Sequence, residues 1–180
     1  EGIHHNTWGA ECYRDVLAAT EAAGVRPDID GKRIGAMGGS FGGYMSNWIG
    51  ANTDRYRCIV THASLYDLTA FYGATDYPSY LLFEFGSDPY RDRAAFERYS
   101  PARFVQAWKT PTLIIHGERD YRVPIGEALA LFEALGAHGV ESELLVFPDE
   151  NHWITRPRNI EVWYRTFLDF AGRHLKVTAR

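Results

Sequence analysis

The sequence predicts an α/β fold in which a mainly parallel sheet has helices on both faces. Short apolar runs alternate with segments whose apolar residues recur every three or four positions, which is the spacing of one helix face. Gly, Pro and other turn residues bound the short runs, as they bound buried strands. Alternating strands and helices form parallel sheets joined by right-handed crossovers.

The first half of the chain predicts two helices and two strands. A helix is expected over 8–23, with Gly24 ending it, and its apolar positions are Cys12, Val16, Ala19 and Ala23. Arg33–Met37 predicts a buried parallel strand that Gly38 and Gly39 end. A helix over Phe41–Ile49 and a strand over Cys58–Thr61 follow.

The second half begins with an aromatic stretch over 66–90 that has no clear period and predicts an excursion with short helices. After it we expect strands at Thr112–Ile115 and Glu143–Phe147, with a helix over Ile125–Leu135 between them. A last helix follows Pro157. Its predicted buried stripe is Ile160, Tyr164, Phe167, Leu168 and Ala171.

Composition limits the possible partners and compartments. The chain has 180 residues, 46% of them apolar, and a formal net charge of -4 that is spread along the sequence. No basic stripe or bilayer-length apolar run occurs, so neither nucleic acid nor a membrane is expected as a partner. Cys12 and Cys58 are expected to be buried thiols, which favours a reducing compartment, the cytoplasm.

The segment Gly38–Gly42 reads Gly-Gly-Ser-Phe-Gly and matches the G-x-S-x-G nucleophile elbow. A predicted strand precedes it and a predicted helix follows, as the motif requires. Ser40 is therefore the candidate nucleophile, and the Phe41 backbone N–H is a candidate oxyanion donor because it opens a helix. We expect side chains at Gly38 and Gly42 to collide with neighbouring backbone.

Two further residues complete a candidate Ser-Asp-His triad in the chain order of α/β hydrolases. Asp120 follows the strand that ends at Ile115, and it is favoured over Glu118, which lies nearer the strand. His152 follows the last strand and precedes the last helix. The sequence thus predicts the C-terminal portion of an α/β-hydrolase fold with serine-hydrolase chemistry.

The remaining motifs carry weaker signals. His4 and His5 have no spaced acidic or thiol partner, and no metal or cofactor is expected. His62 and His116 border strands and are interpreted as hydrogen-bonded structural histidines. One aromatic cluster is compatible with a buried core or with a substrate wall; it comprises Tyr66, Phe71, Tyr72, Tyr77, Tyr80, Phe83 and Phe85.

Several motifs resemble the catalytic domain of the prolyl oligopeptidase family of serine peptidases, in particular its acylaminoacyl-peptidase and dipeptidyl-peptidase branches. The matching stretches are Trp8-Gly9 with Asp15-Val16, Gly38–Tyr44, His116-Gly117 with Asp120 and Arg122–Pro124, and Phe147–Trp153.

The resemblance implies short peptide substrates, Ser40, Asp120 and His152 as the triad, and the Phe41 N–H as one oxyanion donor. It also implies that Phe41, Tyr66 and Val123 line the pocket for the residue that precedes the scissile bond.

Residues 1–180 are expected to form one partial domain, because only one helix and one strand precede Ser40 while the second oxyanion donor comes from an earlier loop. The resemblance implies an N-terminal β-propeller and places that donor, a tyrosine, in the first part of the hydrolase domain. Alone, this segment is expected to be poorly active and marginally folded, with an exposed sheet edge. Whether the protein forms a homo-oligomer stays open.

Two other functions stay open at this stage. The same fold carries carboxylesterases and lipases, and preference for aminoacyl amides over short acyl esters would separate a peptidase from these. A non-catalytic interaction domain is the third alternative, which the complete set of triad residues disfavours.

Overall fold

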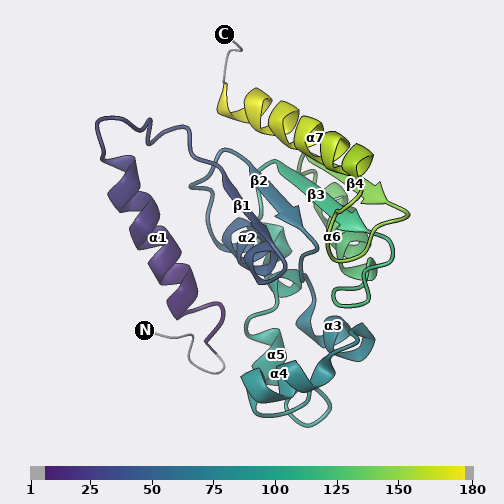
Figure 1. The fold of residues 1–180 in the computed structure, drawn as a ribbon. Coiled ribbons are helices and arrows are strands. Elements are labelled where there is room, and N and C mark those ends of the chain that lie inside the picture. Colours follow the sequence, from purple (N-terminus) through teal and green to yellow (C-terminus); the bar gives the residue numbers. More distant parts are fainter. Residues whose placement is uncertain (1–6, 177–180) are drawn as a thin grey trace.

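The computed structural model describes residues 7–176, which fold into a sheet with helices on both of its faces (Figure 1). The strands are β1 (Ala36–Gly39), β2 (Ile59–His62), β3 (Thr112–Gly117) and β4 (Ser142–Phe147). The α-helices are α1 (Glu11–Gly24), α2 (Phe41–Asn52), α3 (Leu68–Ala74), α4 (Pro78–Phe85), α5 (Arg93–Glu97), α6 (Gly126–Ala137) and α7 (Pro157–Leu175). A 3₁₀ helix, η1 (Pro101–Ala107), precedes β3.

The described sheet is entirely parallel, and its spatial order β1-β2-β3-β4 follows the chain. Gly39 at the end of β1 lies opposite His62, and Gly117 at the end of β3 lies opposite Phe147. The carboxyl ends of the strands therefore meet at one edge, where loops after parallel strands form binding sites.

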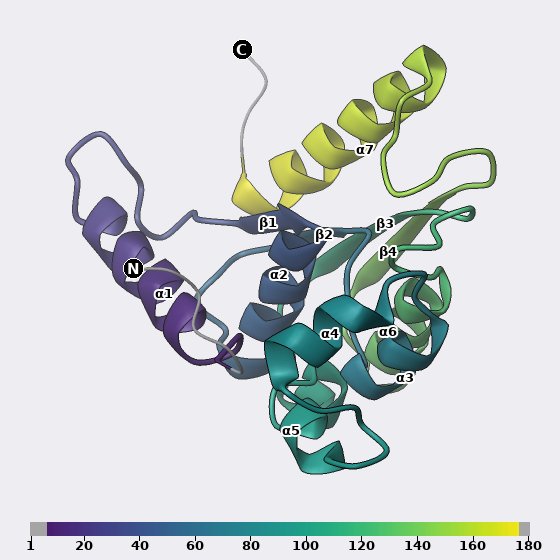
Figure 2. The same cartoon turned by 60° about the horizontal axis from the view of Figure 1, so that its bottom comes forward.

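Figure 2 shows how the helices divide between the two faces of the sheet. Helix α7 covers one face, and α1, α2 and α6 lie on the other. Alternate strand residues point to opposite faces. Ile59 and Ile114 belong to the cluster around α2 and α6, whereas Val60 and Leu113 pack with Phe170 of α7. The predicted α/β architecture with helices on both faces is confirmed.

The first helix begins later than the sequence predicts. Trp8 is 2% exposed and packs in the core, and Trp48 Nε1 donates a hydrogen bond to Gly9 O at 2.8 Å. These contacts hold the chain in a turn before Glu11, where α1 begins. The predicted face is wrong at Ala19, which is exposed, because α1 packs instead through Cys12, Tyr13, Val16 and Leu17.

The prediction of a buried first strand over Arg33–Met37 is wrong in its bounds and in its burial, because β1 covers Ala36–Gly39 and includes the two glycines. Strand β1 lies at the edge of the described sheet, and its burial alternates along the strand. Met37 is 55% exposed because its face of the sheet is not covered at this edge.

The predicted stripe of α7 is wrong at three positions. Ile160, Tyr164 and Leu168 are exposed, and the residues that pack against the sheet are Trp163, Phe167, Phe170 and Leu175. Both sets have helical spacing, so periodicity alone could not choose between them.

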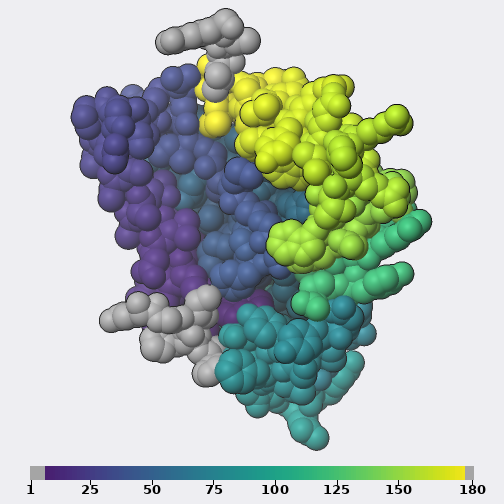
Figure 3. Space-filling view, in the orientation of Figure 1, coloured from purple at the N-terminus to yellow at the C-terminus, as the bar shows by residue number. Residues whose placement is uncertain are grey.

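A groove runs between α7 and β1, and the space-filling view shows the surface hollowed there (Figure 3). Its cavity volume is about 520 Å³. Exposed Met37, Ile160 and Tyr164 contribute to its lining, together with Val60 and Trp163.

The two cysteines are free thiols, with Cys58 buried and Cys12 partly buried. Burial raises the pKa of Cys58 to about 11. Within residues 7–176, no helix combines the length and hydropathy that crossing a membrane requires. His4 and His5 lie outside the described residues.

Candidate active site

Ser40 occupies a strained turn between β1 and α2. Its backbone angles are φ 57° and ψ -120°, in a region that residues other than glycine rarely adopt. The Ser40 N–H donates to His62 O at 3.0 Å, and Tyr44 N donates to Ser40 O at 2.9 Å. One bond joins the turn to β2 and the other to the first turn of α2, so the serine is held where the sheet ends and the helix begins.

The glycines around Ser40 allow close backbone approach, but not at both predicted positions. A Cβ on Gly38 would lie 2.2 Å from Gly42 O, so no side chain fits there. The expected collision at Gly42 is wrong, because a Cβ there would meet nothing within 4 Å. The second crowded position is Gly43, whose Cβ would lie 2.6 Å from Ser64 Cβ and 2.8 Å from His62 O.

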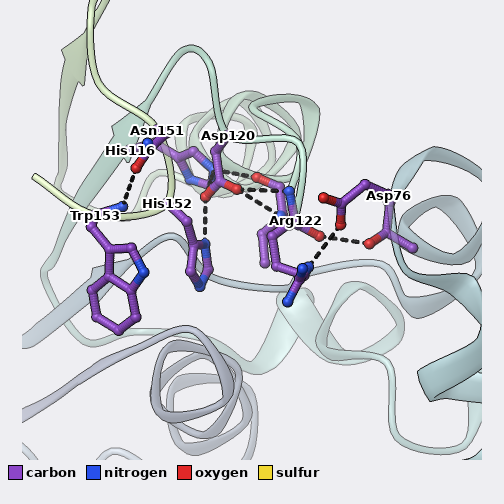
Figure 4. A network of polar contacts seen from close by, with 9 residues as sticks. Asp76, His116, Asp120, Arg122, Asn151, His152 and Trp153 are labelled. Carbon is purple, nitrogen blue, oxygen red and sulfur yellow. Dashed lines mark hydrogen bonds and ion pairs between the residues drawn. The ribbon is translucent and has the colours of Figure 1, made fainter.

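Asp120 follows β3 and is 2% exposed (Figure 4). Its Oδ1 accepts hydrogen bonds from the backbone N–H groups of Arg122 at 3.0 Å and Val123 at 2.8 Å. These donors hold Oδ1 and leave Oδ2 to face His152. The alternative acid, Glu118, is exposed on the same loop.

His152 lies 2.7 Å from Asp120, measured from Nδ1 to Oδ2. Because a carboxylate only accepts hydrogen bonds, Nδ1 is the donor and Nε2 of the neutral ring is left as a base. The loop around His152 is held by Glu150, which is buried and accepts hydrogen bonds from Thr155 N, Arg156 N and Asn159 Nδ2.

Ser40 and His152 line one pocket with a cavity volume of about 370 Å³. Most of its walls are aromatic or aliphatic, which suits an apolar ligand group. The lining residues are Trp8, Ser40, Phe41, Leu65, Phe71, Thr75, Tyr77, Tyr80, Arg122, Val123, His152 and Trp153. Among the residues expected in the pocket, Phe41 and Val123 are present.

Tyr66 is not part of this lining, contrary to expectation. Its side chain is 6% exposed and belongs to the hydrophobic core, and burial raises its pKa to about 12. The aromatic cluster divides accordingly. Phe71, Tyr77 and Tyr80 line the pocket, whereas Phe85 is core and Phe83 is 67% exposed.

Sequence reasoning did not assign Trp8, Arg122 or Trp153 to the pocket. The Trp8 ring packs edge-on against Phe41 at 5.1 Å, and its Nε1 donates to Glu84 Oε2 at 3.0 Å. The one sequence signal for these three residues is that each lies in a stretch that resembles the family. The contacts that bring them to the pocket join segments far apart in the chain, so local patterns could not predict them.

His62 is a neutral residue at the end of β2, opposite Gly39 and next to Ser40, the candidate nucleophile. Trp163 Nε1 donates to His62 Nδ1 at 3.0 Å, so that nitrogen acts as an acceptor. Burial lowers the pKa of His62 to about 4, against the opposing effect of a hydrogen bond with the backbone of His152. The interpretation of His62 as a hydrogen-bonded structural histidine agrees with these contacts.

His116 is only partly hydrogen-bonded. Its Nε2 donates to Val123 O at 2.7 Å and lies 3.5 Å from Asp120 Oδ2. Its buried Nδ1 has no partner among the described residues. Burial lowers the pKa of His116, so the ring is neutral beside the carboxylate.

In the α/β-hydrolase fold, one strand of a parallel sheet turns sharply into a helix at a serine, and the loop after a later strand places a carboxylate beside a histidine. The described residues have this arrangement. Within this fold the chain belongs to the prolyl oligopeptidase family, whose model matches residues 2–178.

Curated relatives include dipeptidyl-peptidase 5 of Porphyromonas gingivalis, 37% identical over 174 residues, and dipeptidyl-peptidase 5 of Schizosaccharomyces pombe, 35% identical over 173 residues. Each match covers 94% of this chain and 25% of the relative. The chain therefore spans about a quarter of the length of these proteins.

Solved structures include an acylaminoacyl peptidase of Pyrococcus horikoshii, with a TM-score of 0.89 and 26% identity over 98% of this chain and 30% of that one. A puromycin-hydrolyzing peptidase of Mycobacterium tuberculosis has a TM-score of 0.91 and 26% identity, and the match covers 98% of this chain and 27% of that one.

The crowding at Gly43 predicts different effects on stability for substitutions at Gly43 and at its neighbour Gly42. Gly43→Ala should destabilise the protein by about 1–3 kcal/mol, because the new methyl group overlaps Ser64 and the end of β2. Gly42→Ala, its control, should be neutral or stabilise by up to about 1 kcal/mol through helix propensity. Thermal unfolding of the two variants measures this. Equal losses would contradict the crowding.

The burial of His62 predicts that it stays neutral in weakly acidic solution. The pKa of His62 is about 4 in the folded protein and about 6.5 in the unfolded chain. As the pH falls below about 6.5, the unfolded chain therefore takes up a proton before the folded protein does. The free energy of unfolding therefore keeps the contribution of the neutral His62 ring above about pH 6.5 and loses it as the pH falls toward 4.

The ¹³Cε1 resonance of His62, assigned by its loss in His62→Gln, should hold its shift from pH 8 to about 5.5 and move only nearer pH 4. A midpoint near the free imidazole value of about 6.5 would refute the neutral, buried state.

Proposed function

We propose that this chain carries the catalytic residues of a serine peptidase that hydrolyses short peptides through an acyl-enzyme on Ser40. The observation that carries the proposal is the Asp120–His152 hydrogen bond of 2.7 Å in a pocket that Ser40 and His152 share. Membership of the prolyl oligopeptidase family supports the peptidase reaction over other chemistry of this fold.

His152 acts as the general base in this mechanism. Its Nε2 removes the Ser40 proton while Oγ attacks the carbonyl carbon, and Asp120 stabilises the imidazolium that forms. The same Nε2–H then protonates the departing amine. A water molecule, deprotonated by His152, hydrolyses the acyl-enzyme and regenerates Ser40. General-base assistance of this kind contributes about 10²–10⁴-fold to the rate.

The negative oxygen of the tetrahedral intermediate requires donors that are already in place. The Phe41 N–H opens α2, where the helix dipole favours negative charge, and we assign it as one donor. One such donor is worth about 10²–10³-fold in kcat. The fold supplies a second donor from a loop that precedes the nucleophile strand.

The pocket favours an apolar or aromatic side chain on the residue before the scissile bond. Aromatic surface in the pocket comes from Trp8, Phe41, Phe71 and Tyr80. The lining also includes Arg122, whose side chain is 50% exposed and forms an ion pair with Asp76. The relatives are named dipeptidyl-peptidases and acylaminoacyl peptidases. We therefore propose release of dipeptides or acylated residues from peptide N-termini.

The remainder of the hydrolase domain, and a β-propeller before it, complete the proposed enzyme. The exposed edge strand β1, the apolar groove beside α7 and the greater length of the relatives support this arrangement. A stable monomer of residues 1–180 that cleaves peptides at the rate of the full-length protein would contradict it.

Substitution of the triad in the full-length protein tests the proposed function. Wild-type protein should release the chromophore from dipeptidyl and acylaminoacyl anilides. Ser40→Ala should abolish turnover and labelling by a fluorophosphonate probe. Asp120→Asn should lower kcat by about 10⁴-fold, because His152 would then adopt the wrong tautomer.

Glu118→Gln is the matched control, since this carboxylate lies exposed on the same loop, and it should leave turnover within about twofold. Preference for short acyl esters over anilides would favour an esterase. Absence of fluorophosphonate labelling at Ser40 in the wild-type protein would favour a non-catalytic domain.

A further inference from the structure

We propose that Glu127 is a positioning residue that holds the wall of the substrate pocket against the loop of the catalytic acid. The pocket wall is the segment 66–80, and the acid loop is the segment 118–123. This inference rests on the proposed peptidase function, because it concerns the same pocket. Glu127 itself does not line the pocket.

Glu127 lies in the first turn of α6, and its side chain points into the interior, where the residue is 5% exposed. Its Oε2 accepts two short hydrogen bonds, from Tyr66 N at 2.7 Å and from Asp67 N at 2.8 Å. Both donors lie between β2 and α3, where no strand or helix pairs them. One carboxylate oxygen therefore holds two consecutive backbone groups.

These two groups begin the pocket wall. Asp67 is the N-cap of α3, and its side chain accepts hydrogen bonds from Thr69 N at 2.9 Å and Ala70 N at 3.2 Å. The segment that starts in this way brings four residues to the pocket, which are Phe71, Thr75, Tyr77 and Tyr80. Ser100 and Ala102 also bond this backbone, at Tyr66 O and Leu68 N. Glu127 is the acceptor for the two N–H groups at the start of the wall and so helps to fix its position at the sheet.

The backbone of Glu127 lies close to the acid loop. Glu127 N donates to Pro124 O at 3.0 Å, and the preceding residue, Val123, donates its N–H to Asp120 Oδ1 at 2.8 Å. Glu127 thus connects the pocket wall to the acid loop through a few short bonds. A displacement at either end changes where the substrate lies relative to His152.

The far end of the wall is joined to the acid loop by separate contacts. Asp76 N donates to Tyr121 O at 2.8 Å, Thr75 Oγ1 donates to Arg122 O at 2.7 Å, and Arg122 Nε pairs with Asp76 Oδ1 at 2.7 Å (Figure 4). Both side chains of this ion pair are about half exposed, and exposed ion pairs contribute little to stability. The connection through Glu127 differs from these in place and burial, because the carboxylate of a residue that is 5% exposed holds the start of the wall.

The carboxylate is costly at this position, which argues for a specific role. Burial raises the pKa of Glu127 to about 7, the nearby charge of Asp67 adds to the rise, and the two N–H donors oppose it. An apolar side chain of similar size would fill the space without this desolvation cost, but it would leave the N–H groups of Tyr66 and Asp67 without this acceptor.

Three variants of the full-length protein test the proposal. Glu127→Met keeps the length and removes the acceptor, Glu127→Gln keeps an acceptor oxygen, and Glu133→Met changes an exposed glutamate of the same helix. For an anilide with an aromatic residue before the scissile bond, Glu127→Met should raise KM about tenfold or more and change kcat less. The other two variants should stay within about twofold.

Hydrogen exchange at the Tyr66 and Asp67 amides gives a readout that does not depend on activity. Exchange should be at least tenfold faster in Glu127→Met than in wild type and close to wild type in Glu127→Gln. If Glu127→Met does not fold, Glu127→Asp replaces it, because its side chain is too short to reach both donors, and the same results are expected.

Unchanged KM in Glu127→Met, or unchanged exchange at these two amides, would overturn the proposal. Faster exchange in a protein whose wild type cleaves no peptide would support the structural connection and refute the proposed peptidase function. The two inferences can therefore fail separately.

Discussion

The parallel register of the four strands is the constraint on which the rest of the site depends. Because every strand runs in the same direction, the segments after β1, β3 and β4 leave the sheet at one edge, and they carry Ser40, Asp120 and His152. The pairing of Gly39 with His62 and the Ser40 N–H bond to His62 O place the serine against β2. A shift in this register would separate Ser40, the candidate nucleophile, from His152, the candidate base.

Buried polar groups determine how precisely this edge is arranged. Asp120 is held by two backbone donors and faces His152, while the neutral rings of His62 and His116 lie near this pair without adding charge. Glu127 serves the backbone of the pocket wall in the same way. Buried carboxylates whose hydrogen bonds are satisfied give a unique geometry, and an unsatisfied one would be costly.

Sequence patterns predicted the order of the elements and the residues of the Asp120–His152 pair, because chain order and local periodicity determine both. Three features could not be predicted from these sequence patterns. Two helical stripes on α7 have equal spacing, so the choice of Trp163 over Tyr164 depends on packing with the sheet. The burial of Tyr66 and the free space at Gly42 likewise depend on neighbours distant in sequence.

The most direct test of the central claim is to identify the acylated residue during turnover. The full-length protein, mixed with a dipeptidyl ester and quenched in acid within the first turnover, would be digested and analysed by peptide mass spectrometry. We expect the mass of the substrate's acyl part on the peptide that contains Ser40, and on Ser40 itself after fragmentation. Turnover with the acyl group on another serine, such as Ser46 or Ser64, would contradict the account.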